Sequence, residues 1–295
     1  MKLFSLFTGI GGLEWGVNQS AEIVGFSEIN KNSIKIFQKN HPSVKNYGDI
    51  TRIDLKELPD FDILTGGFPC QSFSLAGHRK GFDDKRGKMI FYIYDIMKEK
   101  KPEFVVLENV KGIVHHNKGN TLRDVVTLLS YAGYYVRVVL LNAMYYGSAQ
   151  NRERVFFLCS KKDFAVKVPE IKDDTKRFRD IKDKNREEYR FIPKDNERML
   201  KKLKKEHDFQ YELIGGYDRV GTIMTDGGGE KLVWDQENEW FRKLTVLECE
   251  RLQGFPDGFT KGVADSARYF ALGNAVNCSA SYYLFNDYLK GLWWS

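Results

Sequence analysis

The sequence predicts an α/β protein built on a doubly wound, mostly parallel sheet, with a second, smaller lobe attached. Two observations predict this fold class. Short apolar runs alternate with helical patterns over residues 1–160, as in parallel sheets whose strands are joined by helices. Around residue 160 the composition changes to a charged segment that is poor in long apolar runs. We therefore expect one domain from residues 1–160 plus 268–295, and a lobe with its hinge from residues 161–267.

The elements of the first 160 residues follow from their apolar patterns. Strands are expected at residues 2–7, 22–28, 61–67, 103–110, 134–143 and 154–160. Helices are expected between them, at residues 11–20, 30–40, 89–101 and 121–133. In sheets of this kind, ligands bind at the carboxyl ends of the strands, and each motif discussed below falls at such an end.

The remaining chain returns to regular structure after the charged segment. Residues 211–234 resemble strands interrupted by glycines. Helical periodicity resumes at "LTVLECERLQGFPDGF", where Thr245 is the expected N-cap and Glu248, three residues later, completes a capping box. A turn and an apolar helix end the chain.

Charge and cysteine content restrict the class of protein. Residues 161–210 contain 17 of the 46 Lys and Arg but 12 of the 40 Asp and Glu, so they carry five of the six net positive charges. Such a patch suits a polyanion, although a solvated surface is the alternative. The four cysteines show no C-x-x-C spacing, which argues against a metal site or disulfides and favours a reducing, cytoplasmic location. No apolar run approaches the roughly 18 residues of a membrane span.

A glycine-rich loop, "FTGIGG", follows the first expected strand and allows a ligand to approach the backbone closely. Glu28 ends the second strand, 19 residues after Gly9, where an acid can bind ribose hydroxyls. Asp49 is placed to bind an adenine amino group. A nicotinamide dehydrogenase is an alternative on this motif alone, although Glu14 stands where a full G-x-G-x-x-G motif has glycine.

The stretch "GGFPCQSFS" places Cys70 where a strand ends and the chain turns. Backbone amides at such a turn lower the pKa of a thiol and favour the nucleophilic thiolate. A small buried hydrophobic residue is the alternative, which Pro69 disfavours because it stiffens the approach and directs the thiol.

An acid and two arginines complete the set. Glu108 ends an apolar strand, where desolvation raises the pKa of a carboxyl and suits it to hold or donate a proton. Arg152 and Arg154 are two residues apart, so on a strand they share one face and can clamp a polar ring. Surface ion pairs are the alternative for each.

Taken together, these motifs resemble the DNA (cytosine-5) methyltransferases, especially the small bacterial enzymes of restriction-modification systems. The resemblance covers nearly the whole chain except residues 161–221, where members differ and where target choice resides. It is based on the following motifs, in order: "FTGIGGLEWG", "FSEIN", "GDI", "GGFPCQSFS", "DDKRGKMIF", "KPEFVVLENVKGI", "LNAMYYGSAQNRERVFFL", "LTVLECERLQGFPD" and "ALGNAV".

The resemblance implies the chemistry. Cys70 attacks C6 of a flipped-out cytosine, Glu108 stabilises protonated N3, Arg154 contacts O2, and Arg152 supports the cluster. S-adenosyl-L-methionine supplies the methyl group and leaves as S-adenosyl-L-homocysteine. The residues implied to bind it are Phe4, Thr8, Gly9, Ile10, Gly11, Gly12, Leu13, Glu28, Ile29, Asp49, Ile50, Pro69, Met89, Asn274 and Val276. Ile29 departs from the family, which often has an aromatic residue there.

Double-stranded DNA is the implied partner. Residues 74–82 resemble a mobile loop that closes over the flipped base, and residues 161–240 are expected to recognise sequence in the major groove. The DNA-binding residues implied are Ser74, His78, Arg79, Lys80, Gly215, Gly216, Tyr217, Arg219 and Thr222. The alternative for the last group is a surface hairpin in which Arg219 pairs with Asp218.

Two other functions compete with this interpretation besides the dehydrogenase. The tRNA-methylating branch of the same family shares the core chemistry, and a non-catalytic nucleic-acid-binding protein shares the charge. The intact set of Cys70, Glu108 and Arg154 argues against the second. We expect a monomer that acts without a membrane, and functional pairing with a restriction endonuclease is consistent with the resemblance.

Overall fold

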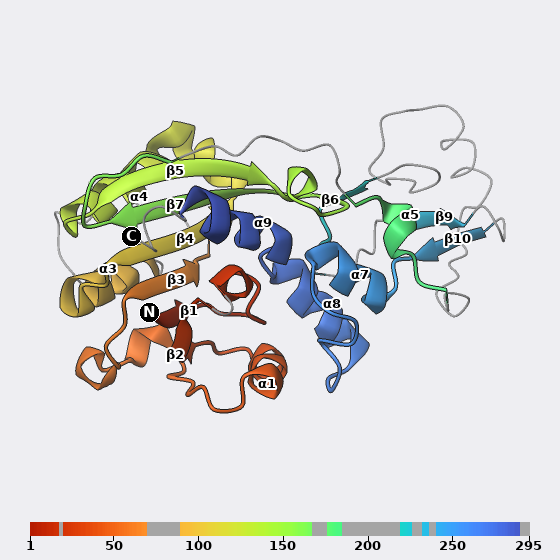
Figure 1. Ribbon diagram of the computed structural model, residues 1–295, viewed down its shortest axis with the longest axis horizontal. Helices are drawn as coiled ribbons and strands as arrows, with labels where there is room; N and C mark the ends of the chain where they lie inside the picture. The colour runs from red at the N-terminus through yellow and green to blue at the C-terminus, as the bar shows by residue number, and fades with distance from the viewer. Residues whose placement is uncertain are drawn as a thin grey trace.

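A six-stranded sheet lies in the larger part of the protein, at the left of Figure 1. The computed structural model describes residues 1–17, 20–69, 89–166, 176–184, 219–225, 232–235 and 240–289. The strand order is β2-β1-β3-β4-β7-β5. The strands are β1 (Lys2–Leu6), β2 (Glu22–Ser27), β3 (Ile63–Gly67), β4 (Phe104–Val110), β5 (Tyr135–Asn142) and β7 (Glu153–Ser160).

The predicted fold class, a mostly parallel α/β sheet, is confirmed, with one strand reversed. β1 pairs in parallel with β2 and β3, and β3 pairs in parallel with β4, whereas β7 is antiparallel to both β4 and β5. The reason is the short link from β5 to β7, which contains only η6 (Ala143–Tyr145) and the two-residue β6 (Gln150–Asn151). A parallel connection needs a crossover of a dozen or more residues. The start of β7 therefore lies at the carboxyl edge of the other strands.

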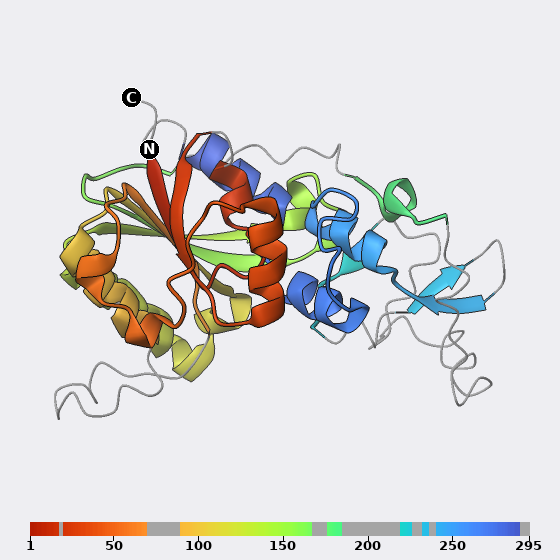
Figure 2. The same ribbon diagram turned by 90° about the horizontal axis from the view of Figure 1, so that it is seen from below.

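Helices cover both faces of the sheet (Figure 2). On one face, α3 (Met89–Lys100) and α4 (Asn120–Tyr131) pack against alternate strand residues such as Val105 and Leu107. On the other face, η1 (Glu14–Val17), α9 (Cys278–Tyr283) and the π-helical turn η8 (Leu284–Tyr288) pack against residues such as Val106. The remaining helices beside the sheet are α1 (Lys31–Asn40), η2 (Ile50–Arg52), η3 (Leu55–Glu57), η4 (Lys111–Val114) and η5 (His116–Gly119).

The helix predicted over residues 11–20 is wrong in type and length. Among the described residues of this segment, only the four of η1 are helical, and they form a 3-10 helix. Tertiary contacts explain the difference, because a side chain at Gly12 would lie 2.1 Å from the Val276 carbonyl oxygen, and one at Gly16 would lie 2.3 Å from that of Ser281. The segment follows the path that the C-terminal residues allow rather than the one its periodicity favours.

A second cluster of helices lies beside the sheet (Figure 1). It contains α7 (Val246–Gln253) and α8 (Asp265–Asn274), and its apolar core includes residues of α1 and of α5 (Phe178–Ile181). The predicted capping box of Thr245 and Glu248 is confirmed at the start of α7. Short strands complete this part: β8 (Val220–Gly221), β9 (Leu232–Asp235) and β10 (Trp240–Lys243). The predicted boundary at residue 268 falls inside α8, and the division into two domains stays a prediction.

Candidate functional site

The predicted site residues of four strands meet at one edge of the sheet. The glycine loop follows β1, Glu28 follows β2, and Glu108 lies near the end of parallel β4. Because β7 runs in the opposite direction, its start lies at this edge, and Arg154 is the register partner of Val110. The edge thus combines a loop able to approach a ligand with an acid and a cation.

The glycine loop is anchored to Glu28. Gly9 and Gly11 have φ of +57° and +88°, a left-handed conformation that other residues seldom adopt. The Gly9 amide donates to Glu28 Oε2 at 2.8 Å, while Oε1 accepts from the amides of Ile29 and Asn30 at 2.9 and 2.8 Å. Three backbone amides therefore fix the carboxylate in place. Glu28 is half-buried, and the Ile29 side chain beside it is 69% exposed.

Asn46 joins Glu28 to Gly48, the residue before Asp49, a role that was not predicted from the sequence. Its side-chain oxygen accepts from the amides of Glu28 and Gly48, and its side-chain nitrogen donates to the Glu28 carbonyl. Asp49 Oδ1 accepts from the amide and hydroxyl of Thr51, both at 2.9 Å. Its Oδ2 accepts no hydrogen bond from the residues that the structure describes. Both predicted acids are thus held at the same edge.

The other residues predicted to bind the cofactor divide by burial. Pro69 and Asn274 are exposed, Met89 is half-buried at the start of α3, and the Asn274 amide donates to the Phe270 carbonyl at 3.1 Å. The side chains of Ile10 and Leu13 belong to the apolar core, so they hold the loop in place rather than present a surface to a ligand. The buried members of the set are Phe4, Thr8, Ile10, Gly11, Gly12, Leu13, Ile50 and Val276.

Glu108 and Arg154 form a largely buried ion pair. Arg154 Nε lies 2.9 Å from Glu108 Oε1, and the two side chains are 15% and 12% exposed. Burial raises the pKa of Glu108 above its usual value, although the positive charges of Arg154 and Arg152 oppose this shift. Burial likewise lowers the pKa of Arg154, against the opposing effect of Glu108. The pair can therefore hold or donate a proton at a site partly shielded from water.

Asn109 links this pair to the residues that precede Cys70. Its buried side-chain amide donates to the Phe68 carbonyl at 2.9 Å, and its oxygen accepts from the Val110 amide at 2.9 Å. Phe68 is followed directly by Pro69 and Cys70. Cys70 itself lies outside the described residues. This role of Asn109 was not predicted from the sequence, although a polar residue inside an apolar strand is a signal for it.

The spacing predicted that Arg152 and Arg154 share one face of a strand, but the two residues do not lie on the same strand. Arg152 lies between β6 and β7, is 2% exposed, and donates to the carbonyls of Gly273 and Ala275 at 2.9 and 2.8 Å and of Ile223 at 3.3 Å. The predicted clamp of two arginines on one ring is therefore wrong for this side chain, because the break in the strand directs it toward backbone carbonyls. Its supporting role stays a prediction.

Only two of the residues predicted to bind DNA lie in the described part of the chain. The Arg219 guanidinium lies over the Tyr145 ring, 6.0 Å from its centroid, and the Thr222 hydroxyl donates to the Asn151 carbonyl at 2.9 Å. The other residues lie outside the described part: Ser74, His78, Arg79, Lys80, Gly215, Gly216 and Tyr217. The alternative pairing of Arg219 with Asp218 is outside it too.

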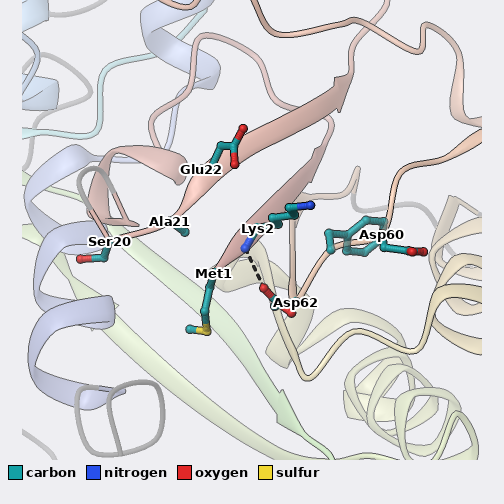
Figure 3. Close-up of a pocket in the computed structure, with 8 residues that line it drawn as sticks. Met1, Lys2, Ser20, Ala21, Glu22, Asp60 and Asp62 are labelled. Carbon is teal, nitrogen blue, oxygen red and sulfur yellow. Dashed lines mark hydrogen bonds between the residues drawn. The ribbon is translucent and has the colours of Figure 1, made fainter.

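A surface hollow lies at the opposite edge of the sheet (Figure 3). It is found at the amino ends of β1 and β2 and before β3, where the Lys2 amide donates to Asp62 at 2.7 Å. It is lined by Met1, Lys2, Ser20, Ala21, Glu22, Asp60, Phe61 and Asp62. None of the predicted site residues lines it, so the carboxyl edge remains the candidate site. In the described part of the chain, no group of three or more His, Cys, Asp or Glu is arranged to hold a metal ion.

The sheet, its glycine loop and the acid after β2 define the fold of S-adenosylmethionine-dependent methyltransferases. The methyltransferase EhMeth of Entamoeba histolytica superposes with a TM-score of 0.80 at 21% identity, over 99% of this chain and 98% of that one. The Dnmt2 methyltransferase of S. pombe gives 0.78 at 21% identity, over 99% of each chain. Among the described residues, no helix is long and apolar enough to cross a membrane.

The family follows from sequence comparison. The family model of C-5 cytosine-specific DNA methylases matches residues 1–290. The type II methyltransferase M.NlaX of Neisseria lactamica is 37% identical over 93% of this chain and 92% of its own length. M1.ScrFI of Lactococcus lactis subsp. cremoris is 36% identical over 93% of this chain and 74% of its own length. M.HhaI of Haemophilus parahaemolyticus is 31% identical over 96% of this chain and 93% of its own length. The chain belongs to the C-5 cytosine-specific DNA methylase family, as its motifs predicted, and is a methyltransferase.

Proposed function

We propose that the chain transfers a methyl group from S-adenosylmethionine to C5 of a cytosine flipped out of a short, specific duplex DNA sequence. The observation that carries the proposal is the buried pair of Glu108 and Arg154, joined through Asn109 to the backbone that leads into Pro69 and Cys70. This arrangement supports the proposal, because it connects the strand that bears the acid to the backbone two residues before Cys70, the proposed nucleophile. The named type II methyltransferases among the relatives support DNA as the substrate.

The residues at the carboxyl edge fit an adenosine group. A carboxylate has about four acceptor positions, and three of those on Glu28 accept backbone amides, which leaves one for a ribose hydroxyl. Asp49 Oδ2 suits an adenine amino group, and the exposed Ile29 side chain suits an aromatic ring face. A side chain added at Gly9 would meet nothing within 4 Å, so the loop has open space in front of it. When bound, S-adenosylmethionine supplies the methyl group.

The chain's own residues then activate the cytosine. The Cys70 thiolate adds to C6, which breaks the C5–C6 π bond and makes C5 nucleophilic. Glu108 holds the proton at N3 as charge develops there, a role that suits a carboxyl whose pKa burial has raised. Arg154 contacts O2 of the base. After C5 has taken the methyl group, a base removes the C5 proton, the π bond reforms, and Cys70 leaves as the thiolate.

DNA must bind so that a base can reach this site. The target atoms are inaccessible inside a duplex, so flipping the base out costs a few kcal/mol that contacts with the remaining DNA must offset. The basic segment of residues 161–210 suits the phosphates, and the region around Arg219 and Thr222 suits recognition of the sequence. Catalysis would thus take place at the carboxyl edge of the sheet, and the target sequence would be selected by the lobe.

Bisulfite sequencing of DNA from cells that express the chain tests the activity and maps the methylated sequence. We expect Cys70→Ser to abolish methyl transfer while leaving S-adenosylmethionine binding nearly intact, because a hydroxyl is a far poorer nucleophile than a thiolate. DNA with 5-fluorocytosine at the mapped position should trap wild-type enzyme covalently, since fluorine cannot leave as a cation. Turnover by the serine variant, or no adduct with the wild type, would sink the thiolate mechanism. Activity on tRNA but not on duplex DNA would identify the other branch of the family.

A further inference from the structure

Residues 219–223, here called the target strap, form hydrogen bonds with residues 149–152. The Val220 amide donates to the Ala149 carbonyl at 2.7 Å, and β6 and β8 pair in parallel, with Gln150 opposite Val220. From the outer side of the target strap, the Thr222 hydroxyl donates to Asn151. The two segments are therefore joined along their length.

Two buried side chains hold the last residue of the target strap at both its backbone groups. Gln150 Oε1 accepts from the Ile223 amide at 3.2 Å, and Arg152 donates to the Ile223 carbonyl at 3.3 Å. Gln150 is 0% exposed, and its side-chain nitrogen donates to Leu252 and Gln253 of α7 at 3.3 Å. Moving the target strap would leave buried polar groups without partners, which is costly. Residues 149–152 and the target strap must move as one body.

α8 closes the other side of the target strap. A Cβ atom at Gly273 would lie 2.5 Å from the carbonyl carbon and oxygen of Met224 and 2.6 Å from the Thr225 amide. The glycine thus lets α8 lie directly against the backbone that leaves the target strap. At the same residue, the Gly273 carbonyl accepts from Arg152.

The target strap has two different faces. Val220 and Ile223 are buried in the apolar core with α7 and α8, whereas Arg219 and Thr222 are partly exposed. Residues 149–152 continue within two residues to Arg154, which pairs with Glu108. A short, rigid path therefore connects the outward side chains of the target strap to the proposed base-binding pair.

We propose that the target strap fixes the distance between the recognised bases and the reactive site, so that it determines which cytosine is methylated, and that Gln150 is a positioning residue for this purpose. The inference rests on the proposed function. DNA held by Arg219 and Thr222 then has one register relative to Glu108 and Arg154. Loosening the target strap should impair selection of the cytosine more than it impairs binding of DNA or cofactor.

Gln150→Ala and Gly273→Ala test the proposal in two independent ways. The first removes the side-chain hydrogen bond between Gln150 and the Ile223 amide, and the second removes no hydrogen bond but forces a methyl group against the backbone of Met224 and Thr225. Tyr134→Phe is the matched control, because it deletes another buried hydrogen bond, from the Tyr134 hydroxyl to the Pro102 carbonyl at 2.7 Å, away from the target strap. If Gln150→Ala fails to fold, Gly273→Ala carries the test.

Methylation is measured on a synthetic duplex with the mapped site and on one with a single base pair changed. We expect kcat/KM on the mapped site to fall about 10- to 100-fold in both variants. In Gln150→Ala a buried polar group loses its partner, and in Gly273→Ala the added methyl group displaces the backbone next to the target strap. On the altered duplex the fall should be less than about threefold, so discrimination shrinks, and S-adenosylmethionine affinity should stay within about twofold. Tyr134→Phe should preserve discrimination.

Equal losses on both duplexes, or unchanged discrimination in a folded variant, would overturn the role of the target strap while leaving the proposed function standing. A wild-type chain that methylates no duplex DNA would overturn the proposed function and, with it, the inference about the target strap.

Discussion

Replacing Glu108 with glutamine should separate the stability of the fold from its chemistry. A glutamine carbonyl oxygen at the position of Glu108 Oε1 still accepts from Arg154 Nε, 2.9 Å away. Glutamine also resembles the protonated acid, the form that burial favours, because burial raises the pKa of Glu108 despite the opposing arginines. The variant therefore retains the hydrogen bond but loses the negative charge and the ability to exchange a proton.

Two opposing effects set the expected stability. A hydrogen bond to a charged partner contributes about 1.5–3 kcal/mol to stability and a neutral one about 0.5–1.5 kcal/mol. Replacing Glu108 with glutamine therefore lowers the free energy of unfolding by about 1 kcal/mol from this effect. Against this, the variant no longer buries a carboxylate. An acid with a raised pKa binds more protons in the folded state, so its stabilisation is complete below the ordinary glutamate pKa and is lost as pH rises through the raised one. Near neutral pH the variant should match the wild type within about 1 kcal/mol, and its relative stability should fall toward acid pH.

The chemistry should respond far more strongly. Loss of a positioned acid typically costs about 10²- to 10⁴-fold in rate, which corresponds to about 2.7–5.5 kcal/mol of barrier. Urea unfolding between about pH 5 and 8 measures stability, and single-turnover methyl transfer to the mapped duplex measures the chemistry. Glu153→Gln is the control, because this neighbouring carboxylate is 36% exposed and pairs with Lys111 at 2.7 Å.

Two results would refute this reasoning. A loss of more than about 2 kcal/mol at neutral pH in Glu108→Gln would mean that the ion pair, rather than desolvation, dominates at this site. A rate within about tenfold of the wild type would exclude Glu108 from proton transfer.

Three further predictions concern the cofactor, the target and a buried acid. Glu28→Ala removes a charged hydrogen-bond acceptor worth about 1.5–3 kcal/mol, so calorimetry should show S-adenosylmethionine binding weakened by about one to two orders of magnitude. An unchanged affinity would mean that the adenosine site lies elsewhere. Arg219→Ala should relax specificity at one base pair and cost about 1–3 kcal/mol of binding free energy on the cognate duplex. Lys204→Ala should weaken binding to all duplexes alike and reduce the slope of the salt dependence by about one. An equal loss on cognate and non-cognate duplexes for Arg219→Ala would mean that Arg219 is a structural residue. Glu14 is fully buried, its Oε2 has no partner among the described residues, and burial raises its pKa. Glu14→Gln should therefore become more stable relative to the wild type as pH rises from about 5 to 8 in urea titrations, and parallel pH profiles would contradict this assignment.

The sequence by itself determined the features that depend on neighbours along the chain. Apolar runs located all six long strands of the sheet, and the spacing of Thr245 and Glu248 predicted a capping box that the structure has. The motif set placed the chain in its family, because nine motifs that resemble those of the family follow one another in order along the chain. Local periodicity and local hydrogen bonding need no knowledge of distant segments.

Only the tertiary structure decided which distant groups meet. The direction of β7, the bond from Asn109 to Phe68, and the contacts of Arg152 with Ile223 and with the end of α8 join segments separated by 41 to 121 positions in the chain. No pattern in the sequence encodes such partners, because a buried donor takes whichever carbonyl the packed core brings within about 3 Å. For the same reason, the sequence placed Arg152 and Arg154 together on one strand face, whereas folding directed one to backbone carbonyls and the other to Glu108.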